Sequence, residues 1–368
     1  MLDDFALEQL IEPLQRWFLG SARVLPWREN PTPYYVWISE IMLQQTRVEA
    51  VKPYFERFIG ELPDIKALAD CPEDRLLKLW EGLGYYNRVR NLNIAAKQIT
   101  SDYGGAMPGE YEELLKLKGI GHYTAGAIAS IAFGQPVPAV DGNVLRVISR
   151  VTADDSDIMK QSVRNNMEEH LRGLMETYAA QGSLKPSMFN QALMELGAMV
   201  CVPNGQPHCE ECPWQDMCLA RKEQRIHELP VKTKAKERRI EERTVFVIRD
   251  GERVILGKRP KKGLLAGLYE FPNIEGSLSQ KEALGYLKGQ GYSPIRIQPL
   301  PEAKHIFSHV EWHMTGYLVT VSELDAAEVS DEVKKQQFMV EVEEARDHYA
   351  IPTAFSKYAA YMNIPLGK

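Results

Sequence analysis

Four of the five cysteines in this 368-residue chain fall within 18 consecutive residues, and this cluster constrains the fold more than any other feature. They are Cys201, Cys209, Cys212 and Cys218, spaced C-x7-C-x2-C-x5-C directly after a predicted helix. Four thiolates on two short loops suit a tetrahedral zinc ion or a cubane iron–sulfur cluster, and the spacing alone does not choose between them. The alternative is a set of unpaired thiols that pack as small apolar groups, as Cys71 is expected to do, and it requires four coincidences in one stretch. The sequence therefore predicts a metal centre.

The overall composition indicates a soluble protein of two or three domains. Hydrophobic residues make up 44% of the chain and charged residues 26%, and no apolar stretch approaches the roughly 20 residues that span a bilayer. Residues 1–16 lack the basic flank and apolar centre of a signal peptide, and five cysteines are too few for a disulfide scaffold, so we expect a cytoplasmic protein. The net charge of −6 gives no overall sign of a nucleic-acid partner, although local basic patches are sufficient for phosphate binding.

Residues 33–222 consist of amphipathic helical segments separated by Pro and Gly. Val144, Val147, Ile148 and Val151, for example, repeat at i, i+3, i+4 and i+7. Pro72-Glu73-Asp74 provides a typical helix start, and Gly82 and Gly84 follow its end. The first two-thirds of the chain is therefore predicted to be all-α.

The pattern changes after residue 227, where a basic connector leads into β-rich sequence. Asp250-Gly251 between two β-rich runs predicts a hairpin, and Ser279-x-x-Glu282 has the spacing of a capping box before a short helix. Val310, Trp312 and Met314 alternate with polar residues, as in a half-buried strand. The last third is predicted to be a separate mixed α/β domain. The connector carries Lys232, Lys234, Lys236, Arg238 and Arg239.

A glycine-containing turn between two predicted helices is a candidate phosphate site. Gly119-Ile120-Gly121-His122 follows a helix expected over Tyr111 to Leu117 and precedes one expected to start near Tyr123. Free N–H groups at a helix N-terminus, with the positive end of its dipole, suit one phosphate. Glycines between helices are more often plain caps, which is the alternative.

Two acidic residues are candidates for chemistry. Asp141 stands where the next helix begins, so it is either a simple N-cap or a carboxylate that the helix dipole keeps ionised. Glu40 is a lone acid among Trp37, Ile41 and Met42, so burial would favour its protonated form and suit a general acid. The alternative for Glu40 is a solvated helix face.

Together these residues resemble the helix-hairpin-helix DNA glycosylase superfamily with an iron–sulfur cluster, and more narrowly MutY-type adenine DNA glycosylases, over nearly the whole chain. The resemblance implies that the cysteines hold a [4Fe–4S] cluster. It implies that Glu40 protonates adenine, that Asp141 stabilises the sugar cation, and that Tyr123 and Asn143 orient the reacting groups. Tyr123 stands where lyase-active relatives carry a Schiff-base lysine, which implies a glycosylase without efficient lyase activity.

The resemblance also implies a set of DNA contacts. Gln191 falls where the family contacts the adenine that is swung out of the duplex. Gln45, Thr46 and Leu83 fall where residues fill the vacated stack, with ordinary helix packing as the alternative for all three. Phe307-Ser308-His309 matches the loop that distinguishes 8-oxoguanine from guanine. The remaining implied substrate contacts are Arg23, Trp27, Arg28 and Tyr85, and the implied phosphate contacts are Gly119, Gly121 and His122.

Three features depart from the family pattern. The first cysteine gap is one residue longer than the commonest form, which bears on the conformation of the loop. Lys118 replaces a usual proline in the hairpin and adds a cation near the phosphate. Residues 276–292 contain Glu282 but lack the clustered carboxylates of an active Nudix box, so nucleotide pyrophosphatase activity is not expected.

These observations predict a multidomain fold, an all-α helix-hairpin-helix glycosylase region followed by an α/β Nudix-like domain. Residues 1–30 and 137–228 would form the cluster-binding lobe, 31–136 a six-helix barrel lobe, 229–242 a basic linker and 243–368 the lesion-recognition domain. The expected partner is double-stranded DNA with adenine opposite 8-oxoguanine or guanine, bound by a monomer. The alternatives are an endonuclease III-like glycosylase–lyase for oxidised pyrimidines, a non-catalytic DNA-binding iron–sulfur protein and a Nudix-type hydrolase.

Overall fold

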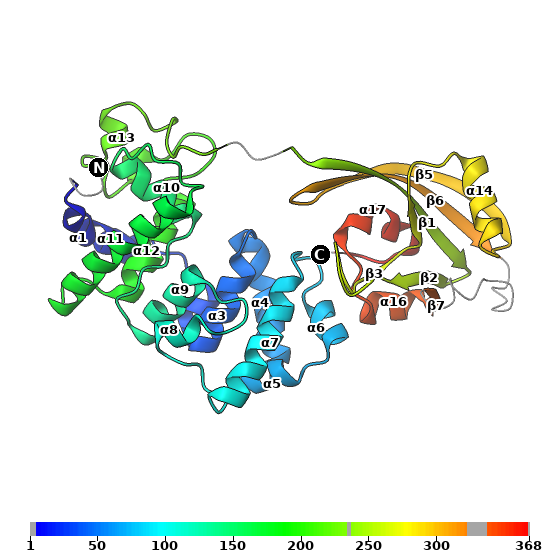
Figure 1. Cartoon of the computed structure of the whole chain (residues 1–368), viewed down its shortest axis with the longest axis horizontal. Helices are drawn as coiled ribbons and strands as arrows, with labels where there is room; N and C mark the ends of the chain where they lie inside the picture. The colour runs from blue at the N-terminus through cyan, green and yellow to red at the C-terminus, as the bar shows by residue number, and fades with distance from the viewer. Residues whose placement is uncertain (1–4, 234–236, 322–336, 367–368) are drawn as a thin grey trace. The chain divides into compact units, whose positions relative to one another are not determined.

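The computed structural model of the chain describes residues 5–233, 237–321 and 337–366. Packing of the Cα atoms divides the chain into two compact units (Figure 1). The first comprises Met1–Asp70 and Asn91–Lys234, and the second comprises Cys71–Arg90 and Ala235–Lys368. In the described ranges, no helix is both long and apolar enough to cross a membrane.

The first unit is entirely helical, as the sequence predicts. Its 3-10 segments are η1 (Leu7–Leu10) and η2 (Cys209–Glu211). Its helices are α1 (Ile11–Ser21), α2 (Pro26–Glu29), α3 (Pro33–Leu43), α4 (Val48–Glu61), α5 (Ile65–Asp70), most of α7 (Asn87–Asp102), α8 (Tyr111–Leu114), α9 (His122–Phe133), α10 (Gly142–Val151), α11 (Gln161–Ala180), α12 (Pro186–Met199) and α13 (Leu219–Lys222). Helix α8 is shorter than expected because the chain turns after Leu114 to reach the glycines of the hairpin.

The start of the chain shares one hydrophobic core with the helices α10, α11 and α12. Leu10 and Leu14 pack in the same cluster as Val144, Ile148 and Phe189. The buried Trp214 of the cysteine loop also belongs to this core, and its indole Nε1–H donates to the carbonyl oxygen of Leu10 at 3.0 Å. The cysteine loop is therefore fastened to the helices that follow the hairpin.

The turn between α8 and α9 depends on glycine for both conformation and space. Gly119 has a φ of +80°, and a Cβ there would lie 2.6 Å from Cβ of Asn91. Gly126 lies inside α9, where a Cβ would lie only 2.2 Å from the carbonyl oxygen of Pro138. This contact brings α9 against the segment that leads into Asp141.

The second unit is built on a mixed sheet. Its strands are β1 (Arg239–Asp250), β2 (Arg253–Lys258), β3 (Tyr269–Glu270), β4 (Asn273–Glu275), β5 (Pro294–Ile306), β6 (Val310–Val321) and β7 (Gln337–Glu341). The order is β3-β2-β1-β6-β5, with β4 paired to β1 and β7 paired to β2. Strands β1 and β6 are parallel and the other described pairs are antiparallel.

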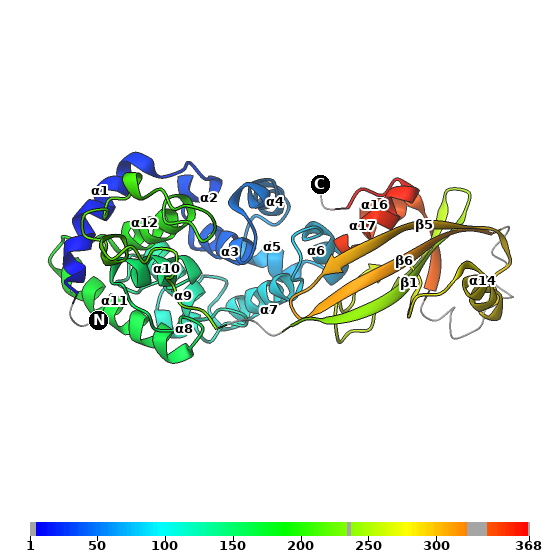
Figure 2. The ribbon, with the colours of Figure 1, turned by 90° about the horizontal axis from the view of Figure 1, so that it is seen from above.

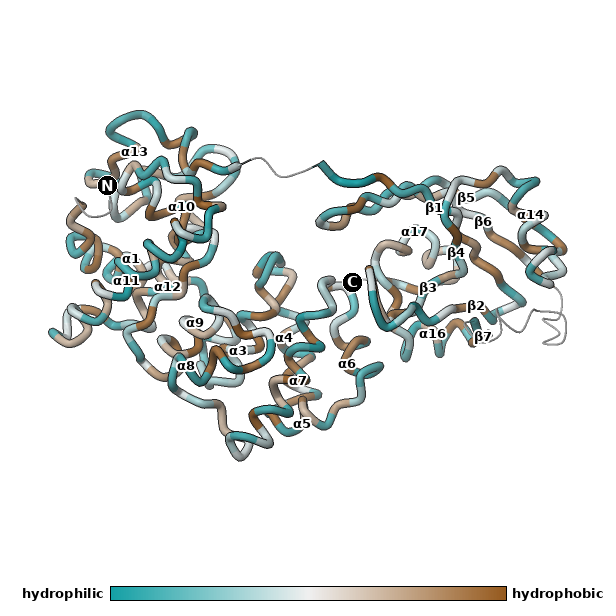
Figure 3. The backbone as a smooth tube through the Cα atoms, viewed as in Figure 1, coloured by the Kyte–Doolittle hydropathy of each residue, from teal (hydrophilic) through white to brown (hydrophobic). Residues whose placement is uncertain are grey.

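Helices cover both faces of this sheet (Figure 2). Phe246 and Ile248 of β1 pack against α14 (Gln280–Gly289), whereas Val245 and Val247 face the core that contains α16 (Val342–His348), η3 (Thr353–Phe355), α17 (Ser356–Ala359) and η4 (Ala360–Met362). The central strands carry the apolar residues, brown in Figure 3, that fill these two cores. The separate mixed α/β domain that the sequence predicts is therefore present.

Several local predictions match the structure of this unit. Asp250 and Arg253 pair across the predicted hairpin. Ser279 and Glu282 form a capping box at the start of α14, and Val310, Trp312 and Met314 are buried on β6. Strand β1 begins at Arg239, within the range 229–242 expected as linker, because parallel pairing with β6 extends down to Val310. Lys234 and Lys236 lie outside the described residues.

Residues 71–90 were expected in the helical lobe, yet they pack with the C-terminal residues. They include α6 (Glu73–Leu79). Lys78 Nζ donates to the carbonyl oxygen of Tyr349, and the backbone N–H of Ile351 donates to Glu81. Arg90 donates to the carbonyl oxygen of Ala266 at 2.6 Å. These side-chain contacts attach the segment to the second unit. Helical periodicity does not predict them, because it reports only which residues share a helix face.

Candidate active site

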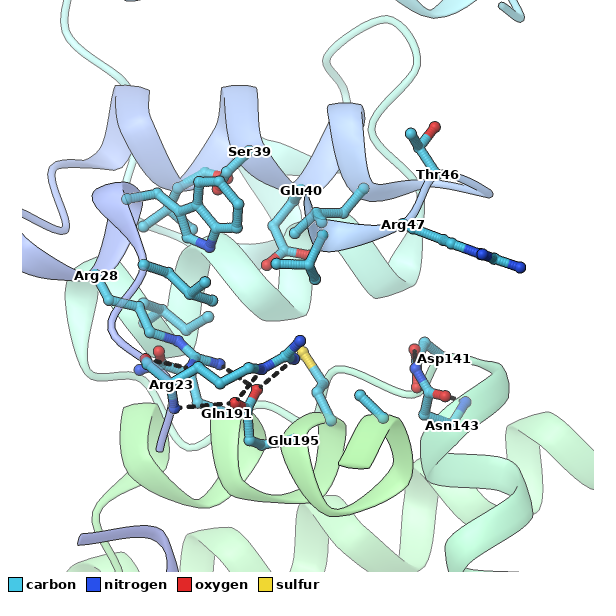
Figure 4. Close-up of a pocket in the computed structure, with 18 of the residues that line it drawn as sticks. Arg23, Arg28, Ser39, Glu40, Thr46, Arg47, Asp141, Asn143, Gln191 and Glu195 are labelled. Atoms are coloured by element: carbon cyan, nitrogen blue, oxygen red, sulfur yellow. Dashed lines mark hydrogen bonds and ion pairs between the residues drawn. The ribbon is translucent and has the colours of Figure 1, made fainter. Parts of the chain in front are cut away.

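A cavity of about 530 Å³ in the helical unit collects most of the residues proposed for the chemistry (Figure 4). Among the predicted residues that line it are Arg23, Trp27, Arg28, Glu40, Thr46, Tyr123, Asp141, Asn143 and Gln191. They come from α2, α3, α9, α10, α12 and the loops beside them. In Figure 4, Glu40 points from α3 into the space that Asp141 and Asn143 border from the start of α10. Tertiary packing therefore brings the two acids to one cavity.

Glu40 is a buried acid whose surroundings favour its protonated form. Helix α3 is apolar on nearly every side, and the residue is 6% exposed. Burial raises the pKa of Glu40 to about 7, and the charge of Asp141 acts in the same direction, whereas the Tyr123 hydrogen bond and Arg28 oppose it. The phenol of Tyr123 donates to Oε2 of Glu40. Glu40 can thus hold a transferable proton near neutral pH.

Asp141 is the N-cap of α10, and three donors converge on its carboxyl group. Its Oδ1 accepts from the backbone N–H groups of Asn143 and Val144, both at 2.8 Å, and its Oδ2 accepts from the Asn143 amide at 2.7 Å. Burial raises the pKa of Asp141 from its ordinary value, and these three hydrogen bonds oppose that rise. Donors and the helix dipole both favour the anion, so the cap also prepares a negative charge facing the cavity.

Arg146 holds Asn143 from behind. Its guanidinium donates to Oδ1 of Asn143 and to the carbonyl oxygen of Gly197, both at 2.8 Å, and to the carbonyl oxygen of Cys201 at 2.8 Å. Gly197 permits this approach, since a Cβ there would lie 2.6 Å from Cβ of Asn143. The orientation of Asn143 therefore depends on α12 and on the first cysteine.

One wall of the cavity contains an ion-pair cluster that the sequence did not predict. Glu195 is 1% exposed and accepts hydrogen bonds from Arg23 Nε at 2.6 Å, Arg23 Nη2 at 2.9 Å and Arg28 Nη2 at 2.9 Å. Burial alone would raise the pKa of Glu195, but its hydrogen bonds with Arg23 and Arg28 lower it to about 2. Arg23 and Arg28 are thus fixed in direction by one buried carboxylate.

Glu195, Met194 and Arg47 line the cavity and were missed at the level of sequence. A weak signal existed for Glu195, which is a lone acid among apolar residues four positions after Gln191 on α12. Residues at i and i+4 share a helix face, so a role for Gln191 extends to Glu195. The Gln191 amide itself donates to Ser187 Oγ at 3.0 Å.

Other predicted contacts lie outside this cavity. Gln45 is exposed, with a φ of 60°, in the turn after α3, and it is absent from the lining. Gly119, Gly121 and His122 are exposed at the hairpin, where Gly121 is the N-cap of α9. His122 Nδ1 lies 2.7 Å from the Tyr111 hydroxyl. These three hairpin residues are therefore accessible to solvent, as a phosphate contact requires.

The second unit has a cavity of about 630 Å³ that contains four more of the predicted substrate residues. Tyr85, Phe307, Ser308 and His309 line it. The Tyr85 hydroxyl lies 3.4 Å from Ser308 Oγ, and Phe307 packs edge-on against Trp312. Leu83 is 7% exposed and does not line this cavity.

The four clustered cysteines surround one small cavity of about 30 Å³ and form no disulfide. Arg150 Nη1 donates to the Cys201 sulfur at 3.3 Å. Within the described ranges, no group of three or more His, Cys, Asp or Glu side chains is arranged to hold a single metal ion. Four sulfur atoms around one cavity, with the buried Arg150 beside them, fit the donor set of a metal centre, either a zinc ion or an iron–sulfur cluster.

Comparison with known proteins gives the family. The description "HhH-GPD superfamily base excision DNA repair protein" matches residues 38–172, and "NUDIX domain" matches residues 244–361. Adenine DNA glycosylase of Mus musculus is 34% identical over 85% of this chain and 71% of its own length. The corresponding protein of Buchnera aphidicola subsp. Baizongia pistaciae is 32% identical over 85% of this chain and 86% of its own length. The chain belongs to the adenine DNA glycosylase family.

Membership of this family makes the protein an enzyme that hydrolyses N-glycosyl bonds in base-excision repair. The chain spans 64% of the length of the Homo sapiens adenine DNA glycosylase, to which it is 34% identical. Among solved structures, that of a thermostable thymine-DNA glycosylase matches 59% of this chain and 96% of its own chain, with 28% identity and a TM-score of 0.50. The predicted family and fold are confirmed.

Proposed function

We propose that this glycosylase releases adenine opposite 8-oxoguanine or guanine, with Glu40 as general acid and Asp141 stabilising the sugar cation. The observation that carries the proposal is the shared cavity of the two acids, in which one carboxyl group is buried and the other is capped by three donors. Cleavage of an N-glycosidic bond passes through an oxocarbenium-like state, which requires both a proton donor and a nearby negative charge.

The chemistry divides between these two groups. Protonated Glu40 donates to N7 of an adenine swung into the cavity, and the electrons of the glycosidic bond leave with the base. The ionised Asp141 stabilises the positive charge that develops on the sugar. Water then adds to the anomeric carbon and releases a proton, which leaves an abasic site. Tyr123 fixes Glu40, and Asn143 fixes Asp141.

Tyr123 favours this reaction over a glycosylase–lyase. A lyase needs an amine that attacks the sugar, and the position instead carries a phenol hydrogen-bonded to Glu40. The endonuclease III-like alternative is therefore disfavoured, and so is the non-catalytic alternative, because the family is enzymatic.

The ion-pair cluster suits the wall of a base pocket. Glu195 accepts hydrogen bonds from Arg23 and Arg28, and these bonds hold both guanidinium groups in place beside the cavity. Fixed polar groups next to Trp27 and Gln191 are what recognition of one extruded base requires. We assign adenine recognition to this wall.

Lesion recognition belongs, in this proposal, to the loop Phe307-Ser308-His309. The loop lines a cavity with Tyr85, and its ends are held, because the Arg239 N–H donates to the carbonyl oxygen of His309 and Phe307 N–H to that of Val310. A rigid loop with exposed polar side chains suits discrimination between two bases that differ by hydrogen-bonding groups.

We further propose that Cys201, Cys209, Cys212 and Cys218 hold a [4Fe–4S] cluster. When bound, the cluster would supply a structural link between the loop and the helical core. Iron and sulfide content with visible absorption tests this assignment, and zinc as the bound metal would contradict it. We also propose that the enzyme acts as a monomer in the cytoplasm.

The central test uses labelled duplexes that differ only in the base opposite adenine: 8-oxoguanine, guanine or thymine. We expect strand cleavage after alkali for the first two and none without alkali. Asp141→Asn should keep duplex binding and lose base release. Asp154→Asn is the matched control, because Asp154 is also buried and accepts a backbone hydrogen bond but lies outside the cavity. Unimpaired single-turnover excision by Asp141→Asn would remove its role.

A further inference from the structure

The loop between α6 and α7 has an unusual backbone. Three of its residues have left-handed conformations: Gly82 with a φ of 99°, Gly84 with 70° and Tyr85 with 48°. Glycine adopts this region freely, but for tyrosine it is strained, because its Cβ approaches the neighbouring carbonyl oxygen. Tyr85 is also 53% exposed, so burial of its ring does not explain the conformation. Another contact must hold the loop.

Arg88, in the first turn of α7, makes that contact. Its Nη2 donates to the carbonyl oxygen of Leu83 at 3.1 Å and to that of Gly84 at 3.2 Å. The Gly84 carbonyl also accepts from the Trp80 indole at 3.0 Å. The loop carbonyls are therefore gathered around one guanidinium group.

The same guanidinium carbon lies over two aromatic rings, 5.3 Å from the centroid of Trp80 and 5.5 Å from that of Tyr85. Burial lowers the pKa of Arg88 to about 10, which still leaves the group charged at neutral pH. Hydrogen bonds from a charged donor and cation–π contacts are stronger in a partly buried site. Arg88 thus fixes both the backbone of the loop and the direction of the Tyr85 ring.

We propose that Arg88 is a positioning residue: through the carbonyl groups of Leu83 and Gly84 it holds the exposed ring of Tyr85 ready to enter the base stack when adenine is extruded. The inference rests on the proposed function, because only an enzyme that swings a base out of the duplex needs a side chain to fill the vacated space. Extrusion breaks stacking and pairing interactions of the base, and inserted side chains replace part of the lost stacking. A loop already in its working conformation does not lose further conformational freedom at that step.

The experiment compares Arg88→Met, Arg88→Lys and the unaltered chain. Each is also made in an Asp141→Asn background, so that the base stays attached. A 2-aminopurine beside the target adenine reports unstacking by its fluorescence. We expect Arg88→Met to reduce the unstacked fraction and to slow single-turnover excision about tenfold, the equivalent of one or two lost hydrogen bonds. Arg88→Lys keeps the charge and should recover part of both signals.

The matched control is Arg57→Met, which removes another guanidinium stacked on an aromatic ring, that of Tyr54 at 4.7 Å, on α4 and outside both cavities. Its excision and fluorescence should equal those of the unaltered chain. The base pairs on either side of the target adenine provide a second readout. A general folding defect would slow excision equally whatever these base pairs are. The Arg88→Met defect should be larger between G·C pairs than between A·T pairs, because stacked neighbours resist extrusion more strongly.

The inference is wrong if both Arg88 variants unstack the 2-aminopurine to the same extent as the unaltered chain in both flanking sequences. It is also wrong if the Arg88→Met defect is the same for both flanking sequences. If Arg88→Met does not fold, as judged by its melting curve, Arg88→Lys carries the same comparison. Failure of the unaltered chain to release adenine would instead contradict the proposed function.

Discussion

Glu40 must remain protonated in a cavity that also holds a negative charge. Apolar neighbours on α3 bury its carboxyl group, and the Tyr123 hydroxyl donates to one of its oxygens. A group tuned by burial in this way is functional in one protonation state only. The rate and the stability of the protein should therefore both depend on the titration of Glu40.

The first consequence is a pH-dependent rate. Since the acid form donates the proton, single-turnover excision should fall about tenfold per pH unit above a pKa of about 7. Glu40→Gln cannot donate, so its residual rate should lack this limb. Excision measured from pH 5.5 to 9 checks both. A rate that rises through pH 8 would contradict the role of Glu40.

The second consequence concerns stability. The pKa of Glu40 is higher in the folded protein than in the unfolded chain, where it is near 4.5, so the folded state binds more protons between these values and stability falls as pH rises from 4.5 to 7. Glu40→Gln removes this loss. The variant should be more stable than the unaltered chain by about 3 kcal/mol at pH 8, with no difference near pH 4. Urea unfolding at the two pH values measures it.

An environment in the site was predictable from the sequence only where the interacting residues are close together along the chain. The cap formed by Asp141 lies within three residues of its donors, and the apolar neighbours of Glu40 lie on the same helix, so both environments were predictable. The partners of Glu195 are more than 160 positions away, at Arg23 and Arg28. No local pattern reports a pairing of that kind.

At the level of elements, the contact of α9 with the segment before Asp141 sets the position of the cavity wall. Gly126 faces the Pro138 carbonyl inside a regular helix. Helical periodicity predicts α9, but it does not report which neighbouring backbone approaches the helix. In the same way, alternation predicts β6 while its parallel pairing with the start of β1 follows only from the fold.

Gly126→Ala should therefore destabilise the protein, by about 1–3 kcal/mol, because the new methyl group collides with backbone rather than with a mobile side chain. Excision should fall with it, as the segment that carries Asp141 is displaced. Gly173→Ala is the control. Gly173 lies inside α11 with open space at its Cβ position. Alanine there should therefore raise the free energy of unfolding by up to about 1 kcal/mol. Thermal melting of both variants distinguishes a steric effect from helix propensity.

For the molecule as a whole, the cysteine loop and the start of the chain share one core through Trp214 and Leu10. Loss of the proposed cluster should therefore loosen a large part of the helical unit as well as the loop. Chelation of iron under reducing conditions should lower the melting temperature and weaken duplex binding. Cys209→Ser should reproduce part of this loss, whereas Cys71→Ser, outside the loop, should leave the iron content unchanged. Normal stability without iron would contradict a structural cluster.

The chain passes from one compact unit to the other at residues 70, 90 and 234, so cutting it once cannot free either unit. A fragment that ends at Thr233 would retain Trp80 and Arg88 but would lose Tyr349, Ile351 and Ala266, which bind that segment. Poor activity of such a fragment would therefore report damage to the loop between α6 and α7 as much as the loss of the Nudix-like domain. Single-residue changes in the full chain separate the two effects.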